Sequence, residues 1–110
     1  MLEVTADLLD EIVRRIVALI HPEKIILFGS RARGEARPAS DLDILVIAKT
    51  TEPRERRSPP LYGALSNLPV DVGIDILVYT PDEVEDWSQV PEAFVTTALR
   101  EGKVLYERAA

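Results

Sequence analysis

The sequence predicts a protein of the α/β or α+β class, and two observations support this prediction. Segments with apolar residues at helical spacing alternate along the chain with short apolar segments rich in β-branched residues. The strand-like segments are almost continuously apolar and only aspartate interrupts them, as expected for a sheet that helices cover on both faces. At 110 residues the chain is long enough for one compact domain with a core and too short for two. We therefore expect one domain over residues 1–110.

The first part of the chain predicts a helix followed by two strands. Thr5 or Asp7 can cap a helix with an apolar face, and Pro22 forbids its continuation. Residues 24–28 form a short apolar run of β-branched type that ends at a Gly-Ser pair, and residues 42–48 form a second such run. Both runs are expected to be strands.

The connections around these strands have different compositions. Residues 31–40 are expected to form a turn and a short helix. Residues 49–60 contain three prolines and many charges with almost nothing apolar, so they predict an exposed loop. A short helix is expected to follow through residues 61–68.

The last part of the chain predicts a strand, two helices and an edge strand. Residues 70–79 are expected to be the third strand, and residues 80–83, Thr-Pro-Asp-Glu, are typical of a helix capping box. Residues 92–101 carry apolar side chains at helical spacing and end at Gly102. Residues 104–106 then predict a strand at the edge of the sheet.

The composition is that of a soluble globular protein and excludes several classes of function. Thirteen basic and 19 acidic residues give a net charge of −6, so the chain is expected to repel nucleic acid and anionic membranes. Cysteine is absent, which excludes disulfides, thiolate nucleophiles and the usual structural zinc sites, and leaves oxygen ligands for any metal. The N-terminus does not follow the pattern of a signal peptide, and no apolar run approaches the length of a membrane span. We therefore expect a cytoplasmic protein.

Aspartates on two strands predict a metal site. Asp41 and Asp43 are two residues apart at the start of a strand, so both carboxylates can point to the same face. Two like charges placed together favour a cation, and carboxylate oxygens suit Mg²⁺. The third strand offers Asp71 and Asp75 on one face, and Asp75 is the better third ligand because apolar residues place it well inside the strand.

A Gly-Ser pair near these aspartates predicts a phosphate site. Gly29 and Ser30 lie where a strand is expected to give way to a turn and a helix, and free backbone N–H groups at such a place bind anions. Arg31, Arg33 and Arg37 follow, and the guanidinium group matches phosphate oxygens well. An acidic protein thus keeps a basic neighbourhood at one place.

These motifs together resemble the signature of a known superfamily. Gly29-Ser30, followed after ten residues by Asp41-x-Asp43, looks like the signature of the DNA polymerase beta-type nucleotidyltransferases. More narrowly, the chain resembles the minimal nucleotidyltransferases, or MNT proteins, from its first helix to its last strand. The resemblance implies an α+β fold of two layers, in which helices back the small mixed sheet of the polymerase beta-type palm.

The resemblance also implies a reaction and the residues that carry it. It implies transfer of AMP from ATP to a hydroxyl group, with two Mg²⁺ ions and with pyrophosphate as the leaving group. Asp41, Asp43 and Asp75 match the metal ligands, and Asp75 is also the candidate base. The residues expected around the nucleotide are Gly29, Ser30, Arg31, Arg33 and Ser40.

The same resemblance implies a partner, and two other functions stay open. MNT-type proteins are commonly paired with a HEPN-domain protein, often as the antitoxin of a HEPN ribonuclease toxin, and modification of a partner tyrosine is one implied activity. The first alternative is a non-catalytic nucleotide-binding module that neutralises or scaffolds its partner by forming a complex. The second is transfer to a small molecule such as an aminoglycoside. Self-association through Trp87, Phe94 and the last strand is also compatible with the sequence.

Overall fold

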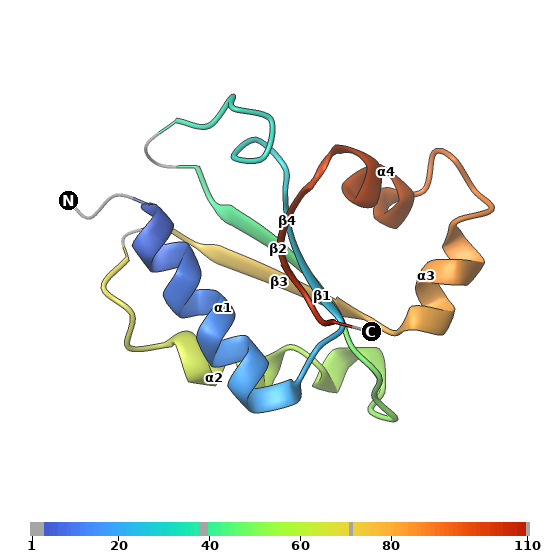
Figure 1. Ribbon diagram of the computed structural model, residues 1–110, viewed down its shortest axis with the longest axis horizontal. Coiled ribbons are helices and arrows are strands. Elements are labelled where there is room, and N and C mark those ends of the chain that lie inside the picture. The colour runs from blue at the N-terminus through green and yellow to red at the C-terminus, as the bar shows by residue number, and fades with distance from the viewer. Residues whose placement is uncertain (1–3, 38–39, 71, 110) are drawn as a thin grey trace.

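A computed structural model describes residues 4–37, 40–70 and 72–109 of the protein. Within these residues four strands form one sheet with the order β3-β2-β1-β4 (Figure 1). The strands are β1 (Lys24–Phe28), β2 (Leu42–Ile47), β3 (Ile74–Tyr79) and β4 (Lys103–Glu107).

The sheet is mixed. Strand β1 is antiparallel to both β2 and β4, whereas β2 and β3 are parallel. Strands β3 and β4 are the two edges, so the prediction of an edge strand near the C-terminus is confirmed. The predicted α+β class with a small mixed sheet is also confirmed.

Helices lie on both sides of this sheet. Figure 1 shows α1 and α2 on one side and α3 and α4 on the other. The helices are α1 (Ala6–Ile20), α2 (Pro59–Leu65), α3 (Pro81–Trp87) and α4 (Phe94–Glu101), with a 3₁₀ turn, η1, at Arg54–Arg56. Within the described ranges, no helix combines the length and the apolar character needed to cross a bilayer.

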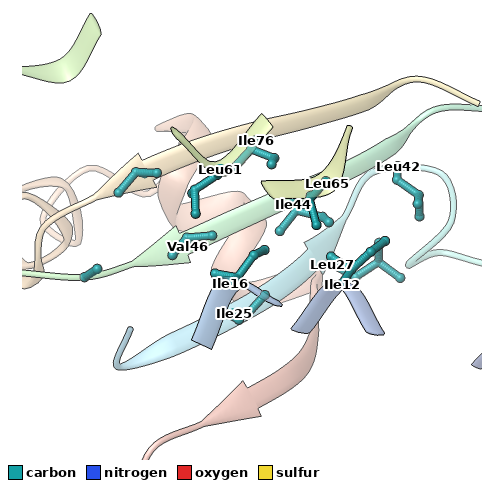
Figure 2. Packing of buried hydrophobic residues seen from close by; sticks show 12 residues of the cluster. Ile12, Ile16, Ile25, Leu27, Leu42, Ile44, Val46, Leu61, Leu65 and Ile76 are labelled. Atoms are coloured by element: carbon teal, nitrogen blue, oxygen red, sulfur yellow. The ribbon is translucent and has the colours of Figure 1, made fainter. Parts of the chain in front are cut away.

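The larger part of the core lies between the sheet and the first pair of helices. Ile12 and Ile16 of α1 and Leu61 of α2 are completely buried against the strands (Figure 2). A smaller cluster on the opposite face packs Val95 and Ala98 of α4 against the strands. Because side chains alternate between the two faces of a strand, each central strand contributes to both clusters. The buried residues of the second cluster are Ile26, Leu45, Ile47, Val95 and Ala98.

Local signals set several element boundaries as predicted. The Thr5 hydroxyl accepts a hydrogen bond from the Leu8 N–H at 3.2 Å, so Thr5 rather than Asp7 caps α1. The capping box at the start of α3 is complete, with reciprocal hydrogen bonds between Thr80 and Glu83. Each of these bonds satisfies a backbone N–H that the first turn of a helix leaves without a partner.

Two predictions from the sequence were wrong and a third was only partly right. Residues 31–34 form successive turns instead of a short helix, because Gly34 takes a positive φ of 73° and the Glu35 N–H bonds to Ser30 O, five residues back, so the helical bonding pattern does not continue. Strand β3 begins at Ile74 rather than at residue 70. The Val70 N–H bonds to the Leu68 carbonyl in a turn, and the parallel ladder with β2 starts only at Ile74. Residues 49–56 are largely exposed, as expected, but the segment predicted as a loop also contains η1 and the start of α2.

Candidate active site

A row of three residues crosses the sheet on the face opposite α1 and α2. Phe28 of β1 pairs with Asp43 of β2, and Asp43 pairs with Asp75 of β3. Ile44, the neighbour of Asp43, belongs to the core against α1, so Asp43 points to the other face. The register of the strands therefore brings two of the predicted carboxylates side by side.

Asp43 lies in the most strongly perturbed environment of this row. Partial burial and the neighbouring charges of Asp75 and Asp41 raise its pKa, and so does a hydrogen bond with the Asp75 side chain. Like charges held close together disfavour the ionised form of a carboxyl group, and this is the direction of the shift at Asp43. The positive charge of Arg33 acts in the opposite direction, so Arg33 also lies near this group. A bound cation would relieve the repulsion between these carboxylates.

Asp41 is anchored to the neighbouring strand segment. Its Oδ1 accepts a hydrogen bond from the Gly73 N–H at 3.2 Å, and the Leu42 N–H beside it bonds to the Gly73 carbonyl at 2.9 Å. A Cβ atom at Gly73 would lie 2.8 Å from Asp41 Oδ1, which is closer than such atoms approach. Gly73 is thus a residue of the site that the sequence reasoning missed. The available signal was a glycine two residues before Asp75.

Gly29 is required by both its conformation and its surroundings. Its φ of 77° lies in the left-handed region, and a Cβ atom there would collide with a carboxylate oxygen of Asp43. The predicted Gly-Ser turn therefore packs its backbone directly against the carboxylates. Since no helix follows within the described residues of the segment, any phosphate site here consists of a turn and not of a helix N-terminus.

The two candidate arginines lie in different environments. The Arg31 guanidinium donates two hydrogen bonds to the carbonyl of Ser40, from Nε at 3.0 Å and from Nη2 at 2.7 Å. These bonds tie the Gly-Ser turn to the segment that enters β2, while the Ser40 hydroxyl accepts a bond from the Arg37 N–H at 2.8 Å. Arg33 is exposed and pairs with Glu35 at 3.3 Å. The structure thus gives Arg31 and Ser40 a positioning contact and leaves Arg33 near the carboxylates.

A pocket of about 260 Å³ opens beside this site. Its lining residues are Phe28, Gly29, Arg33, Phe94, Thr97, Ala98 and Glu101. The rings of Phe28 and Phe94 meet edge to face with centroids 5.1 Å apart. The sequence indicated an apolar helix face over residues 92–101 and self-association through Phe94, but it did not indicate a pocket.

Carboxylate oxygens are suitable ligands for a divalent cation, but only two of the three predicted carboxylates lie together. Asp43 and Asp75 lie together, and carboxylate oxygens are the ligands that Mg²⁺ prefers. Over residues 4–37, 40–70 and 72–109, however, no three acidic or histidine side chains converge closely enough to hold an ion as they are placed. Asp41, which would complete the set, bonds instead to Gly73. Asp71, the alternative third carboxylate, lies outside the described residues.

The sequence profile of one family matches residues 10–110, and its description reads Polymerase beta, Nucleotidyltransferase. The chain belongs to this family. The match extends over nearly the whole chain and includes the Gly-Ser turn and all the candidate carboxylates. Among curated proteins, none matches the chain significantly.

Two solved structures resemble this nucleotidyltransferase in fold. One is a Sulfolobus solfataricus protein proposed to be a nucleotidyltransferase, with 22% identity and a TM-score of 0.62 over 89% of this chain and 76% of that one. The other is a toxin-antitoxin structure with AMP-PNP, with 26% identity and a TM-score of 0.59 over 91% of this chain and 73% of that one.

Proposed function

We propose that this nucleotidyltransferase transfers AMP from ATP to a hydroxyl group of a partner protein and thereby acts as an antitoxin. The observation that carries the proposal is the juxtaposition of Asp43 and Asp75 on one face of the sheet, directly beside the Gly29 turn. The acceptor that we propose is a tyrosine of a HEPN-domain toxin. The toxin-antitoxin structure with AMP-PNP, which is similar in fold, supports an adenine nucleotide as donor and a toxin as the partner.

The carboxylates would hold Mg²⁺ in this reaction. Asp41, Asp43 and Asp75 are the proposed ligands, and Asp41 would offer the oxygen that does not bond to Gly73. Two bound Mg²⁺ ions would supply charge neutralisation for the triphosphate and would lower the pKa of the acceptor hydroxyl. The triphosphate would lie on the side of Asp43 away from Asp75, where Gly29 and Arg33 line one pocket and the Arg33 guanidinium could bind phosphate oxygens.

The chemical step needs a base and a surface that the acceptor hydroxyl of the partner can reach. The acceptor oxygen bonds to the α-phosphorus of ATP, the bond from that phosphorus to pyrophosphate breaks, and the hydroxyl proton passes to a base. Asp75 is the candidate base, because its side chain is exposed on an edge strand. Leu77, two residues further on the same face, is 40% exposed. This half of the face is accessible to the side chain of a folded partner.

One observation favours the alternative of a non-catalytic nucleotide-binding module. The carboxylates do not converge as they are placed in the described residues, and the Asp41 carboxylate is bonded to backbone. Under this alternative the protein neutralises its partner by complex formation alone. The two functions make opposite predictions for the transfer of label from ATP.

The test is a transfer assay with α-labelled ATP, Mg²⁺ and the partner that co-purifies with the protein. Wild type is compared with the Asp41→Asn/Asp43→Asn variant and with Asp10→Asn/Asp86→Asn. The second variant removes the same number of charges from exposed helical positions outside the site. We expect the partner to be labelled by wild type and by the helix variant but not by the site variant. A stable complex that neutralises the partner without any labelling would instead establish the binding module.

A further inference from the structure

The pocket between β1 and α4 has no role in the chemistry described so far. Its wall on the α4 side is a single stripe of that helix, in which Phe94, Thr97, Ala98 and Glu101 follow one another at helical spacing. Its other wall is formed by Phe28, Gly29 and Arg33, at the end of β1 and in the turn that follows. The pocket volume of about 260 Å³ lies below the range of sites for drug-sized ligands and suits a single small ring system.

The pocket lies on the side of the site where the donor nucleotide is proposed to bind, and not on the side of the acceptor. Gly29 belongs both to the pocket and to the turn proposed to hold the triphosphate. Asp75, the candidate base for the acceptor, lies on the other side of Asp43, on β3. In the order of strands β3-β2-β1, the acceptor therefore approaches over β3 and the donor lies over β1. A group in the pocket is on the donor side.

The chemistry of the lining suits a flat heterocycle with polar edges. Phe94 is 45% exposed, and its ring is held edge to face by Phe28, so it offers an aromatic surface in a set orientation. Stacking on such a ring is a common way of binding a nucleobase. Thr97 and Glu101 carry a hydroxyl and a carboxylate on the same helical stripe. Glu101 Oε2 accepts a hydrogen bond from Arg100 at 3.3 Å, and we assign Oε1 to the ligand. A carboxylate accepts hydrogen bonds from the exocyclic amino group of a purine.

We propose that this pocket binds the purine base of the donor nucleotide, with the base stacked on Phe94 and its amino group bonded to Glu101. The inference rests on the proposed function, because it requires a nucleoside triphosphate in the neighbouring site. It makes α4 the element that distinguishes ATP from a bare triphosphate. The catalytic carboxylates then need no contact with the base.

The test compares ATP with inorganic tripolyphosphate, both titrated calorimetrically in the presence of Mg²⁺. Tripolyphosphate probes the triphosphate site alone, and the ratio of the two affinities measures the contribution of the base. In Phe94→Ala we expect the affinity for ATP to fall about tenfold, while that for tripolyphosphate stays unchanged. The matched control is Trp87→Ala, since Trp87 is 43% exposed, does not line the pocket and should affect neither ligand.

A second variant distinguishes the loss of base binding from a folding defect in Phe94→Ala. Thr97→Trp fills the pocket and should weaken ATP in the same way while leaving tripolyphosphate binding intact. Equal affinities of wild type for ATP and tripolyphosphate, or a parallel loss of both ligands in Phe94→Ala with native stability, would overturn the base pocket and leave the proposed function standing. Binding of neither ligand to wild type would overturn both.

Discussion

Two glycines determine how closely the backbone approaches the carboxylates. Gly29 packs against the Asp43 carboxylate and Gly73 against that of Asp41, and neither place has room for a Cβ atom. Gly73 also donates its N–H to Asp41 Oδ1, which orients the side chain and leaves Oδ2 for a ligand. At the scale of single residues, the site thus depends on backbone contacts as much as on acidic side chains.

The first prediction concerns Gly73→Ala. The added methyl group would lie 2.8 Å from Asp41 Oδ1, so the carboxylate must move away from its anchor. We expect the affinity for Mn²⁺, measured by electron paramagnetic resonance, to fall about tenfold, as is typical when the support of a metal ligand is lost. Gly63→Ala is the control, because a Cβ atom at Gly63 meets nothing within 4 Å. Unchanged Mn²⁺ affinity in Gly73→Ala would show that the Gly73 contact has no role in the site.

The sequence predicted the acidic residues of the site better than their supports. The alternation of strand side chains placed Asp41 and Asp43 on one face, and Asp75 was expected as a third carboxylate from a neighbouring strand. The register pairs Asp75 with Asp43. The role of Gly73 depends on a long-range contact with a residue 32 positions away, which no local pattern encodes. The contact of Arg31 with the Ser40 carbonyl was equally invisible, because a sequence shows the charge of a guanidinium but not its partner.

At the scale of elements, two side chains cover the open edge of β3. The Tyr62 hydroxyl accepts a hydrogen bond from the Ile76 N–H at 2.8 Å, and Arg57 Nη1 donates to the Val78 carbonyl at 3.2 Å. Both bonds come from α2 or the segment before it. They occupy backbone groups that an edge strand otherwise offers to another strand. The segment around residues 57–62, expected to be loop and helix start only, therefore protects the sheet.

The second prediction tests this cover with Tyr62→Phe. The substitution keeps the ring and removes the acceptor of the Ile76 N–H, so it should reduce the free energy of unfolding by about 1 kcal/mol. Urea unfolding monitored by circular dichroism measures the change. Tyr106→Phe serves for comparison, because that tyrosine lies on β4 at the opposite edge. An equal loss of unfolding free energy in both variants would mean that removing any tyrosine hydroxyl has this effect, and that the β3 edge has no special role.

The third prediction concerns Glu83, which joins α3 to the segment before α2. Its Oε1 accepts hydrogen bonds from Arg57 at 2.6 Å and from the Thr80 N–H at 2.8 Å, and the Arg57 contact is the main reason that its pKa falls from 4.5 to about 2. The folded state therefore binds its proton less readily than the unfolded chain does. The stabilisation is fully present above pH 4.5 and is lost as the pH falls towards 2.

Glu83→Gln should remove most of this contribution. Because the side chain is 26% exposed and screened by solvent, we expect a loss of about 1–2 kcal/mol at pH 7. The difference between the two proteins should shrink progressively below pH 4.5 and vanish near pH 2. Urea unfolding at pH 7, 4 and 2.5 checks this. A difference that stays constant over that range would attribute the loss to packing and not to the charge.

Element boundaries were predictable where a local signal sets them and not where tertiary contacts do. The caps of α1 and α3 follow from Thr5 and from the capping box at residues 80–83. The start of β3 depends on where its pairing with β2 begins, and this is a contact between segments that are distant in the sequence. The turns at residues 31–34 are local, but they follow from the positive φ of Gly34 and not from a periodic pattern of apolar residues.

At the scale of the whole molecule, the two faces of the sheet serve different purposes. The face under α1 and α2 carries the larger core cluster, whose strand residues include Ile44 and Ile76. On the face under α4, packed apolar side chains cover β1. On the same face of β3, Asp75 and Leu77 are exposed to solvent. The open half holds like charges that a closed core would not tolerate. Asp43 lies on β2 between these two halves, so the charge that the proposed function requires there is unfavourable for the fold.

The last prediction tests this conflict with Asp43→Asn. Burial and the charges of Asp75 and Asp41 raise the pKa of Asp43, so its ionised form destabilises the folded protein at neutral pH. Without a divalent cation, the variant should melt a few degrees higher than wild type at pH 7. Mg²⁺ should raise the melting temperature of wild type by binding only the folded state, and should have little effect on the variant.

The pH dependence of this difference follows from the direction of the shift. The folded state binds the Asp43 proton more readily than the unfolded chain, so the penalty is absent below pH 3.8 and develops as the pH rises through the folded-state pKa. The metal-free melting temperatures of wild type and Asp43→Asn should therefore converge in acid and separate towards neutral pH. Scanning calorimetry in the presence of a chelator measures both curves. A variant that melts below wild type at pH 7 would mean that the contacts of the Asp43 carboxylate outweigh the repulsion, and that the carboxylates stabilise the fold without a cation.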